Sequence, residues 1–269
     1  MEKVKFILKQ LEEKMSKEPV ELNVSGYMTK DLITVSQNVS FFDAVTKMYK
    51  NGIGNLIVIH DDKVIGLLTE RQILQYLVTE KIIHDKPMSH VATSLFTKIS
   101  PDTSLLDAAK IRFKKKRKLL VFENEKLVVI LTTSDMLRGL QKLSTAPKLD
   151  NVMASTLYTC SYDDLLFEQI KLMNEKNIGS VIVTKDGKQY GIFTERDLID
   201  NILAIQADMS ETVGQYSSNP LVTAEVGINF HDAAIIMTEK KIKRLPLTSQ
   251  GQITTIVCAC DLLRAFETL

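Results

Sequence analysis

An internal repeat restricts the fold of this chain more than any other feature of its sequence. When the sequence is shifted by 125 residues, "GLLTER" at 66–71 falls on "GIFTER" at 191–196 without a gap. Ile53 and Gly54 fall on Ile178 and Gly179 in the same register, and the matches concentrate at glycine, threonine and apolar positions. Self-similarity at a fixed period indicates a duplicated structural unit.

A shorter period divides each half of the chain again. One equivalent position, at spacings of 63, 62 and 64 residues, is occupied by Thr69, Thr132, Thr194 and Cys258. Three residues after each of these stand Gln72, Asp135, Asp197 and Asp261. The chain therefore contains four units of about 60 residues, in which the first resembles the third and the second resembles the fourth. Because a unit of about 60 residues has a marginal core, we expect the units to pack in pairs.

Each unit reads as strand, helix, strand, strand, helix. In the first unit, "DLITVS" at 31–36 alternates like a short strand, and apolar residues at 41, 44, 45 and 48 line one face of a helix. Ser40 is the predicted N-cap of that helix. The segments 55–59 and 64–68 then read as a hairpin, and in the third unit Asp186-Gly187 is a strong hairpin signal. The hairpin leads into the second helix, which the threonine caps.

This order of elements, with its closing Gly–apolar–apolar–Thr-x-x-Asp sequence, resembles the cystathionine-β-synthase (CBS) domain. Four such units resemble two tandem CBS pairs. The resemblance implies an α/β (α+β) fold of four β-α-β-β-α repeats, packed as two pseudo-two-fold pairs. We expect the repeats at 22–82, 86–144, 149–206 and 209–269, with 22–144 as the first pair and 149–269 as the second.

Residues 1–18 are predicted to form a separate amphipathic helix. An apolar stripe at helical spacing is formed by Val4, Ile7, Leu8, Leu11 and Met15. This helix could pack on its own pair of repeats or on a second copy of the chain, or it could dock on a partner protein. It is too short and too balanced in charge to favour a membrane surface.

Composition favours a soluble, cytoplasmic protein. The 34 basic and 33 acidic residues leave a net charge of +1, which gives no general nucleic-acid footprint. The three cysteines do not form a disulfide framework and fit a reducing compartment. Neither a signal peptide nor a membrane-length apolar segment is recognisable, so we expect no membrane partner.

The Thr-x-x-Asp junction suits a nucleoside phosphate. A threonine at the start of a helix can cap the helix and face an anion held at its positive end. An aspartate one turn later can accept two hydrogen bonds from the vicinal hydroxyls of a ribose. The resemblance implies the same chemistry, because CBS proteins commonly bind adenosine nucleotides in the cleft between paired units. Helix capping alone is the competing explanation for each motif.

The four units match this motif to different degrees. The third is complete, with Thr194 and Asp197, whereas the second has Val129 and the fourth has Thr255 in place of the glycine. In the first unit, Gln72 lacks the charge of a carboxylate, so we expect a weak, altered or empty site there. Asp197 and Asp261 mark the sites of first choice.

Basic residues precede the middle strand in two units. Lys118 and Arg244 stand where the other units have Asn55 and Ser180. The resemblance implies that such residues point toward phosphate, and a pseudo-two-fold axis would bring Arg244 near the motif of the third unit. For the run Lys114–Lys118, the alternative is a solvated basic helix end. The candidate residues for binding an adenosine nucleotide are Thr69, Arg71, Lys118, Thr132, Asp135, Thr194, Arg196, Asp197, Arg244 and Asp261.

Other chemistry is weakly signalled. Cys258-x-Cys260 could bind a soft metal, but there is no second cysteine pair, and strand alternation would place both side chains on one packing face. We therefore predict no metal site. The four histidines have no metal-ligand spacing, and no catalytic constellation is visible, so we expect no enzyme activity.

These patterns favour a non-catalytic regulatory protein with no required cofactor. AMP, ADP or ATP would bridge paired repeats as a regulatory ligand, and a protein partner or a second copy of the chain would sense the change. One alternative is a structural or interaction protein with vestigial ligand clefts. The other is a nucleic-acid-binding module that uses the Lys114–Lys118 run, which steep salt dependence would reveal.

Overall fold

The computed structural model describes residues 22–29, 31–80, 86–144, 146–149, 156–203 and 208–268. The helix predicted at 1–18 lies outside these residues. The described part of the chain forms four three-stranded sheets with their helices, one set for each unit of the sequence. No helix in these ranges has the length and apolar character needed to span a membrane.

Each repeat contains the predicted series of elements. The first has β1 (Thr34–Ser36), α2 (Phe41–Lys50), β2 (Asn55–His60), β3 (Lys63–Thr69) and α3 (Glu70–Thr79). The second has β4 (Phe96–Ile99), α4 (Leu105–Lys115), β5 (Lys118–Glu123), β6 (Lys126–Leu131) and α5 (Thr133–Leu140). The third has β7 (Thr159–Ser161), α6 (Leu166–Glu175), β8 (Ser180–Lys185), β9 (Lys188–Thr194) and η3 (Leu198–Leu203). The fourth has β10 (Ala224–Glu225), α7 (Phe230–Glu239), β11 (Arg244–Ser249), β12 (Gln252–Cys258) and α8 (Ala259–Arg264).

The strand order is the same in all four sheets. The first strand pairs in parallel with the second, and the second pairs in antiparallel fashion with the third. A parallel pair needs a crossover connection, which the helix between the two strands supplies. The closing helix of the third repeat differs from the expectation, because η3 is wound as a π-helix.

Local signals in the sequence account for the element boundaries. The hydroxyl of Ser40 accepts a hydrogen bond from the Asp43 N–H at 3.1 Å, which confirms the predicted N-cap of α2. Asp186 and Gly187 have φ values of 51° and 72°, so the predicted hairpin turn places both central residues in the left-handed region.

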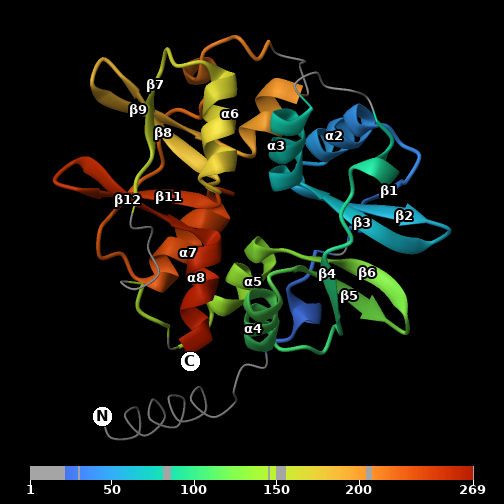
Figure 1. The fold of residues 1–269 in the computed structure, drawn as a ribbon. Helices are drawn as coiled ribbons and strands as arrows, with labels where there is room; N and C mark the ends of the chain where they lie inside the picture. Colours follow the sequence, from blue (N-terminus) through green and yellow to red (C-terminus); the bar gives the residue numbers. More distant parts are fainter. Residues whose placement is uncertain are drawn as a thin grey trace, which may run out of the picture.

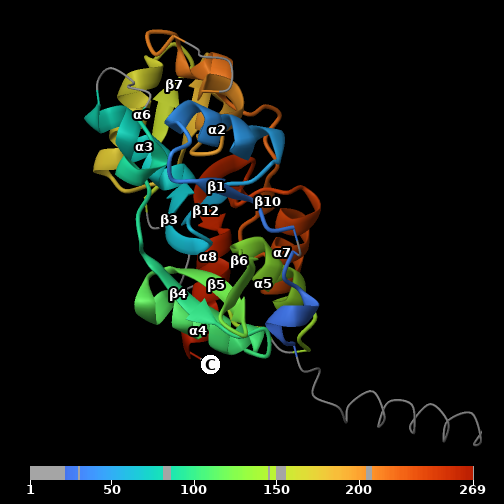
Figure 2. The same cartoon turned by 90° about the vertical axis from the view of Figure 1, so that its right-hand side faces the viewer.

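The helices lie in the middle of the molecule, between the sheets of the first two repeats and the sheets of the last two (Figure 1). One hydrophobic core joins repeats one and three, where Phe41 and Leu74 are buried with Ile170 and Phe193. A second core joins repeats two and four, through α4, α5, α7 and α8. Figure 2 shows the same division from the side. The largest cores therefore connect one sequence pair to the other.

Repeats that are consecutive in the sequence are connected through their sheets. Ile57, Leu67 and Leu120 form a smaller buried cluster between repeats one and two. The segment that leads into the second repeat also forms a two-way backbone bridge with β3, between Thr93 and Leu67. Ser218 and Ile192 form the equivalent bridge between repeats three and four.

Two glycines of the repeat permit these bridges. A Cβ on Gly66 would lie 2.9 Å from the carbonyl oxygen of Thr93, and a Cβ on Gly191 would lie 2.7 Å from that of Ser218. Both distances are shorter than normal packing allows, so the glycine of the closing motif makes room for the neighbouring backbone.

Candidate functional site

Asp197 of the third repeat lies at the boundary between paired repeats. Its side chain accepts four hydrogen bonds. Thr194 donates to Oδ2 from its backbone N–H and its hydroxyl, both at 2.7 Å, while Asn201 and Ser218 donate to Oδ1 at 3.1 Å. Ser218 belongs to the segment that leads into the fourth repeat. Burial raises the pKa of Asp197 to about 6, even though its hydrogen bonds with Thr194 and Ser218 lower the pKa.

The equivalent residues in the first pair have the same surroundings. Thr29, in the segment that precedes the first sheet, donates its hydroxyl hydrogen to Asp135 at 3.0 Å. The Gln72 side-chain amide donates to the hydroxyl of Thr93 at 2.7 Å, and Thr93 belongs to the segment that precedes the second sheet. The other atom of this amide, Oε1 of Gln72, is buried and has no hydrogen-bond partner among the described residues. The junctions of the first three repeats thus each contact the segment that leads into their pair partner.

Capping, the competing explanation for the motif, is present at every junction. The Thr69 hydroxyl accepts from the Gln72 N–H at 3.3 Å. Thr132 with Asp135, and Cys258 with Asp261, each form a complete capping box. In the third repeat the Thr194 hydroxyl accepts from the Arg196 N–H at 3.2 Å. The ribose-binding role of the aspartates therefore stays a prediction.

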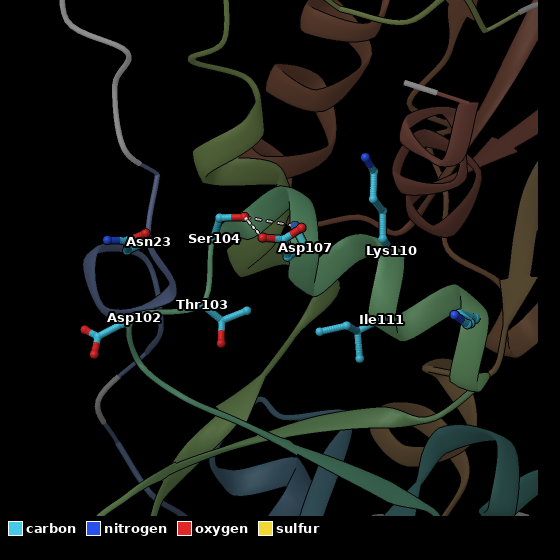
Figure 3. A pocket seen from close by; sticks show the side chains of 8 residues that line it. Asn23, Asp102, Thr103, Ser104, Asp107, Lys110 and Ile111 are labelled. Atoms are coloured by element: carbon cyan, nitrogen blue, oxygen red, sulfur yellow. Dashed lines mark hydrogen bonds between the residues drawn. The ribbon is translucent and has the colours of Figure 1, made fainter.

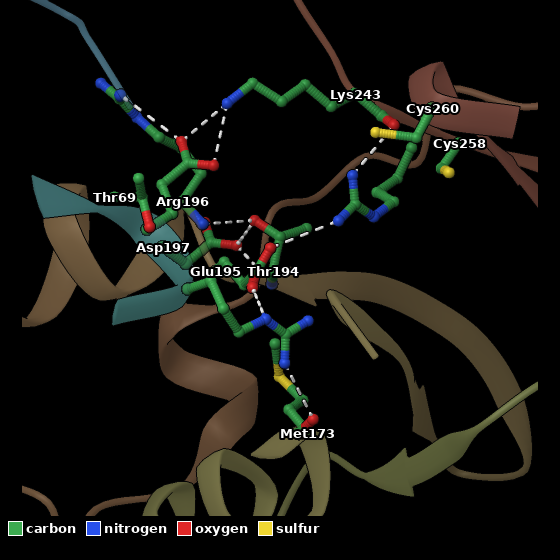
Figure 4. A network of polar contacts seen from close by, with 12 residues as sticks. Thr69, Met173, Thr194, Glu195, Arg196, Asp197, Lys243, Cys258 and Cys260 are labelled. Carbon is green, nitrogen blue, oxygen red and sulfur yellow. Dashed lines mark hydrogen bonds and ion pairs between the residues drawn. The ribbon is translucent and has the colours of Figure 1, made fainter. Parts of the chain in front are cut away.

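The duplicated Thr-Glu-Arg sequences meet at the centre of the molecule (Figure 4). Nε of Arg71 lies 2.6 Å from Oε1 of Glu195, and Nη1 of Arg196 lies 3.9 Å from Oε1 of Glu70. The arginine of each copy therefore contacts the glutamate of the other copy. This exchange explains why the two segments are so similar, since they occupy equivalent positions across the boundary between the two pairs.

The fourth repeat adds two further ion pairs to this centre. Nζ of Lys243 lies 2.8 Å from Oε2 of Glu70, and Nη2 of Arg244 lies 3.3 Å from Oε2 of Glu195. As the sequence predicted, Arg244 thus lies beside the motif of the third repeat. Burial opposes the ionisation of Glu70, but contact with Lys243 and the charges of Arg196 and Lys118 hold its pKa below the ordinary value.

Two glycines leave space for these ion pairs. A Cβ on Gly54 would lie 2.2 Å from Oε1 of Glu70, and a Cβ on Gly179 would lie 1.9 Å from Nη2 of Arg244. These glycines are identical in the two halves of the sequence because each is packed against a charged side chain at the centre.

The basic run of the second repeat divides in space. Residues 114–117 are exposed around the end of α4, whereas Lys118 begins β5 and faces the centre. Burial, together with the charges of Arg112 and Lys243, lowers the pKa of Lys118 to about 8. We call the whole group the central cluster: Glu70, Arg71, Arg112, Lys118, Glu195, Arg196, Lys243 and Arg244.

The central cluster is unbalanced in charge. Within the described part of the chain it combines six cationic side chains, contributed by all four repeats, with the carboxylates of Glu70 and Glu195. At its edge, a third carboxylate, that of Asp200, pairs with Nε of Arg196 at 2.7 Å. Its partly exposed cations would attract a multiply charged anion. The sequence prediction contained four of its cations but missed Lys243, Arg112 and both glutamates. The exact repetition of Thr-Glu-Arg was the signal that could have found the glutamates.

A separate hollow opens on the surface along α4 (Figure 3). It is lined by Asn23, Asp102, Thr103, Ser104, Asp107, Lys110, Ile111 and Lys114. The Ser104 hydroxyl is occupied in capping α4 through the Asp107 N–H at 3.0 Å. This hollow contains none of the Thr-x-x-Asp residues. In the described ranges, no three His, Cys, Asp or Glu side chains are grouped to hold a metal ion.

Known proteins resemble this chain in sequence and in fold. It is 26% identical over 269 residues to an uncharacterized protein of Methanocaldococcus jannaschii, a match that covers 90% of this chain and 61% of that protein. The chain therefore spans about three fifths of the length of that relative. A crystal structure of a different protein from that organism, described as a candidate archaeal homologue of γ-AMPK, superposes with a TM-score of 0.76 at 18% identity. That match covers 91% of this chain and 100% of the other.

A second crystal structure, of an uncharacterized conserved protein from Pyrococcus horikoshii, superposes with a TM-score of 0.63 at 17% identity. It covers 91% of this chain and 100% of the other, and at this identity both structures support the fold alone. The family model of the CBS domain matches residues 24–79, 88–142, 149–204 and 213–268. With four matches over most of its length, this chain belongs to the CBS-domain family, as a protein with two tandem CBS pairs.

Proposed function

We propose that this chain is a non-catalytic regulatory protein that binds AMP, ADP or ATP between its paired repeats and signals to a partner. The observation that carries this proposal is the central cluster, in which six cations from four repeats outnumber the carboxylates of Glu70, Glu195 and the adjoining Asp200. A multiply charged phosphate chain is the ligand that best complements such a cluster.

The geometry of the third and fourth repeats supports one arrangement of the ribose and the phosphates. Asp197 lies three residues after Thr194, and Glu195, the first of the two residues between them, contacts Arg244 in the central cluster. A nucleotide whose ribose hydroxyls meet Asp197 would therefore direct its phosphates toward Arg244 and Lys243. Binding would exchange the present hydrogen bonds of Asp197 with Thr194 and Ser218 for bonds to the ligand.

The signal would come from the boundary between the two pairs. Arg71 and Arg196 hold the pairs together through Glu195 and Glu70, and the same arginines are candidate phosphate ligands. A phosphate chain that binds these arginines would weaken their ion pairs with Glu195 and Glu70. The ligand would therefore bind more tightly to an arrangement in which the two pairs of repeats are less closely joined than in the present one. Such a difference is what allows a ligand to shift a conformational equilibrium.

The comparisons support this proposal through the fold. A described homologue of γ-AMPK, the gamma subunit of AMP-activated kinase, shares the arrangement of four repeats. That structure supports the fold alone, so the adenosine nucleotide is proposed from the Thr-x-x-Asp junctions and the central cluster of this chain. We add to the proposal a cytoplasmic location and a protein partner or homodimer as the receiver of the signal.

Calorimetric titration tests the proposal. Purified full-length protein would be titrated with adenosine, AMP, ADP, ATP and S-adenosylmethionine. We expect affinity to rise with the number of phosphates, and Arg244→Gln to weaken ATP binding by about tenfold or more, the loss of one charge-assisted contact. Lys114→Gln removes an exposed cation outside the cluster and serves as the matched control. If folded protein bound none of these compounds, the proposal would be wrong.

A structural protein with vestigial clefts is the second candidate. It is favoured by the four hydrogen bonds that already occupy Asp197 and by the pairing of both central glutamates with cations. This candidate predicts that Asp197→Ala leaves partner binding unchanged, whereas a nucleotide sensor would lose ligand-dependent partner binding. The nucleic-acid alternative is less favoured, because Lys118 turns away from the exposed residues 114–117.

A further inference from the structure

Two of the three cysteines lie together at the edge of the central cluster (Figure 4). Cys258 ends β12 and caps α8, and Cys260 lies in the first turn of α8. The sequence interpretation placed both in one strand, which is wrong for Cys260 because the Cys258 cap turns the chain into a helix. Both side chains are partly exposed, so small reagents can reach them.

The two thiols contact each other and a set of cations. Cys258 and Cys260 are joined by a side-chain hydrogen bond. Sγ of Cys260 also accepts from Nη2 of Arg112 at 3.8 Å, and Cys258 lies directly across the hairpin from Arg244. The charged side chains that act on the two thiols come from four elements and are Arg112 (α4), Lys118 (β5), Arg244 (β11) and Asp261 (α8).

This environment makes the two thiols unequal. The hydrogen bond from Cys258, together with Arg112 and Arg244, lowers the pKa of Cys260 against the effect of burial. The same hydrogen bond and burial raise the pKa of Cys258. Cys160, by contrast, is the buried middle residue of β7, and burial raises its pKa to about 12. These effects favour the thiolate form at Cys260 and the protonated form at Cys258 and Cys160.

We propose that Cys258 and Cys260 form a thiol oxidation site, in which Cys260 reacts with a hydroperoxide and Cys258 converts the product to a disulfide. The Cys260 thiolate attacks the peroxide, the O–O bond breaks, and the alkoxide leaves and takes a proton from solvent. Cys260 is then a sulfenic acid, oxidised by two electrons. The Cys258 sulfur attacks the Cys260 sulfur and forms the S–S bond. The S–O bond breaks, and hydroxide leaves with the proton of Cys258 as water.

A metal is a poorer occupant for this pair of thiols. Soft cations prefer thiolate ligands, but Arg112, Lys118 and Arg244 surround this pair with positive charge. The same charge that repels a metal cation stabilises a thiolate and attracts anionic or polar oxidants. The arrangement therefore favours redox chemistry over metal binding.

Pulsed alkylation of the folded full-length chain tests the reactivity. Iodoacetamide would be added at about pH 6, and the labelled peptides measured by mass spectrometry. Cys260 should be alkylated at least about tenfold faster than Cys258 and Cys160, because only its thiolate is populated there. Arg112→Gln should slow the labelling of Cys260, and Arg112→Lys, which keeps the charge, should largely restore it. Equal rates for Cys260 and Cys258 in the folded wild type would overturn the proposal.

Peroxide treatment tests the second step. After a stoichiometric addition of hydrogen peroxide, the peptides should contain a disulfide between Cys258 and Cys260 and an unmodified Cys160. Cys258→Ser lacks the resolving thiol, so its Cys260 should accumulate sulfenic acid that dimedone traps. Absence of the disulfide in the wild type, with the same amount of trapped sulfenic acid in both proteins, would refute the resolving role of Cys258.

Discussion

Replacing Glu195 by glutamine should weaken the fold and strengthen anion binding at the same time. The Glu195 side chain is 11% exposed, and it joins Arg71 of the first repeat to Arg244 of the fourth. Breaking a fully buried pair costs about 3–5 kcal/mol, and the partial exposure of both arginines reduces this to about 2 kcal/mol. For a chain of this size, the melting temperature should fall by about 4–8 °C.

The opposite effect is expected for the ligand. Glu195→Gln removes one negative charge while leaving the cations of the central cluster in place. A unit charge about 6 Å from a phosphate, at an effective dielectric constant of about 40, contributes about 1.4 kcal/mol. Binding of ATP to Glu195→Gln should therefore be about tenfold tighter than binding to the wild type.

Calorimetric melting and titration of the same preparations measure both effects. Glu168→Gln is the matched control, because Glu168 is exposed on α6 and pairs with Lys171 only at the surface, at 3.2 Å. The control should melt and bind ATP like the wild type. A loss of stability in Glu195→Gln with unchanged or weaker ATP binding would refute the assignment of the central cluster as a phosphate site.

Three further substitutions test separate parts of the structure. The pKa of Asp197 is raised to about 6 in the folded protein, so the folded state binds this proton more tightly than the unfolded state does. As the pH rises from about 4 to about 7, the wild type should therefore lose up to about 3 kcal/mol of stability relative to Asp197→Asn, measured by urea unfolding. Gly191→Ala should reduce the unfolding free energy by about 2 kcal/mol, since its Cβ meets the Ser218 carbonyl, whereas Gly26→Ala, with open space around it, should change it by less than about 0.5 kcal/mol. The pKa of Lys118 is lowered to about 8, so its charge costs stability at neutral pH. Lys118→Met should therefore raise the melting temperature and weaken ATP binding. A rise in both stability and ATP affinity, or a fall in both, would contradict this prediction.

The fold was largely predictable because the sequence repeats its signals four times. Apolar periodicity, the cap at Ser40 and the turn at Asp186-Gly187 identified the elements and their order. Four registers of the same pattern reinforced each other, and resemblance to a known family then implied the packing in pairs. The π-helical winding after Thr194 had no signal of this kind, since its sequence closely resembles that of α3.

The association between the two pairs was not predictable in the same way. The sequence pattern shows that α2 has an apolar face, but not which helix covers it. The structure places repeat one on repeat three and repeat two on repeat four, which makes the boundary between the pairs the main hydrophobic core. Glu70 and Glu195 become central only through this packing, so an analysis of single units passed over them.

The candidate junctions illustrate a different limit. Asp197 and Asp135 were identified from spacing, and both lie between paired repeats. Their hydroxyl partners, Ser218 and Thr29, lie in linker segments. No local sequence motif marks these two side chains as partners of the aspartates. Capping and ligand binding use the same residues, and therefore the motif alone could not separate the two roles.

A crystal structure of the full-length chain with saturating ATP tests the central claim most directly. The account predicts the triphosphate within hydrogen-bond distance of Lys243 and Arg244, with the ribose at Asp197 and the bond between Thr194 and Asp197 rearranged. The opposite result would be a central cluster that keeps all its present ion pairs, with ATP bound only at the outer surface or absent from the crystal. That result would contradict the central claim.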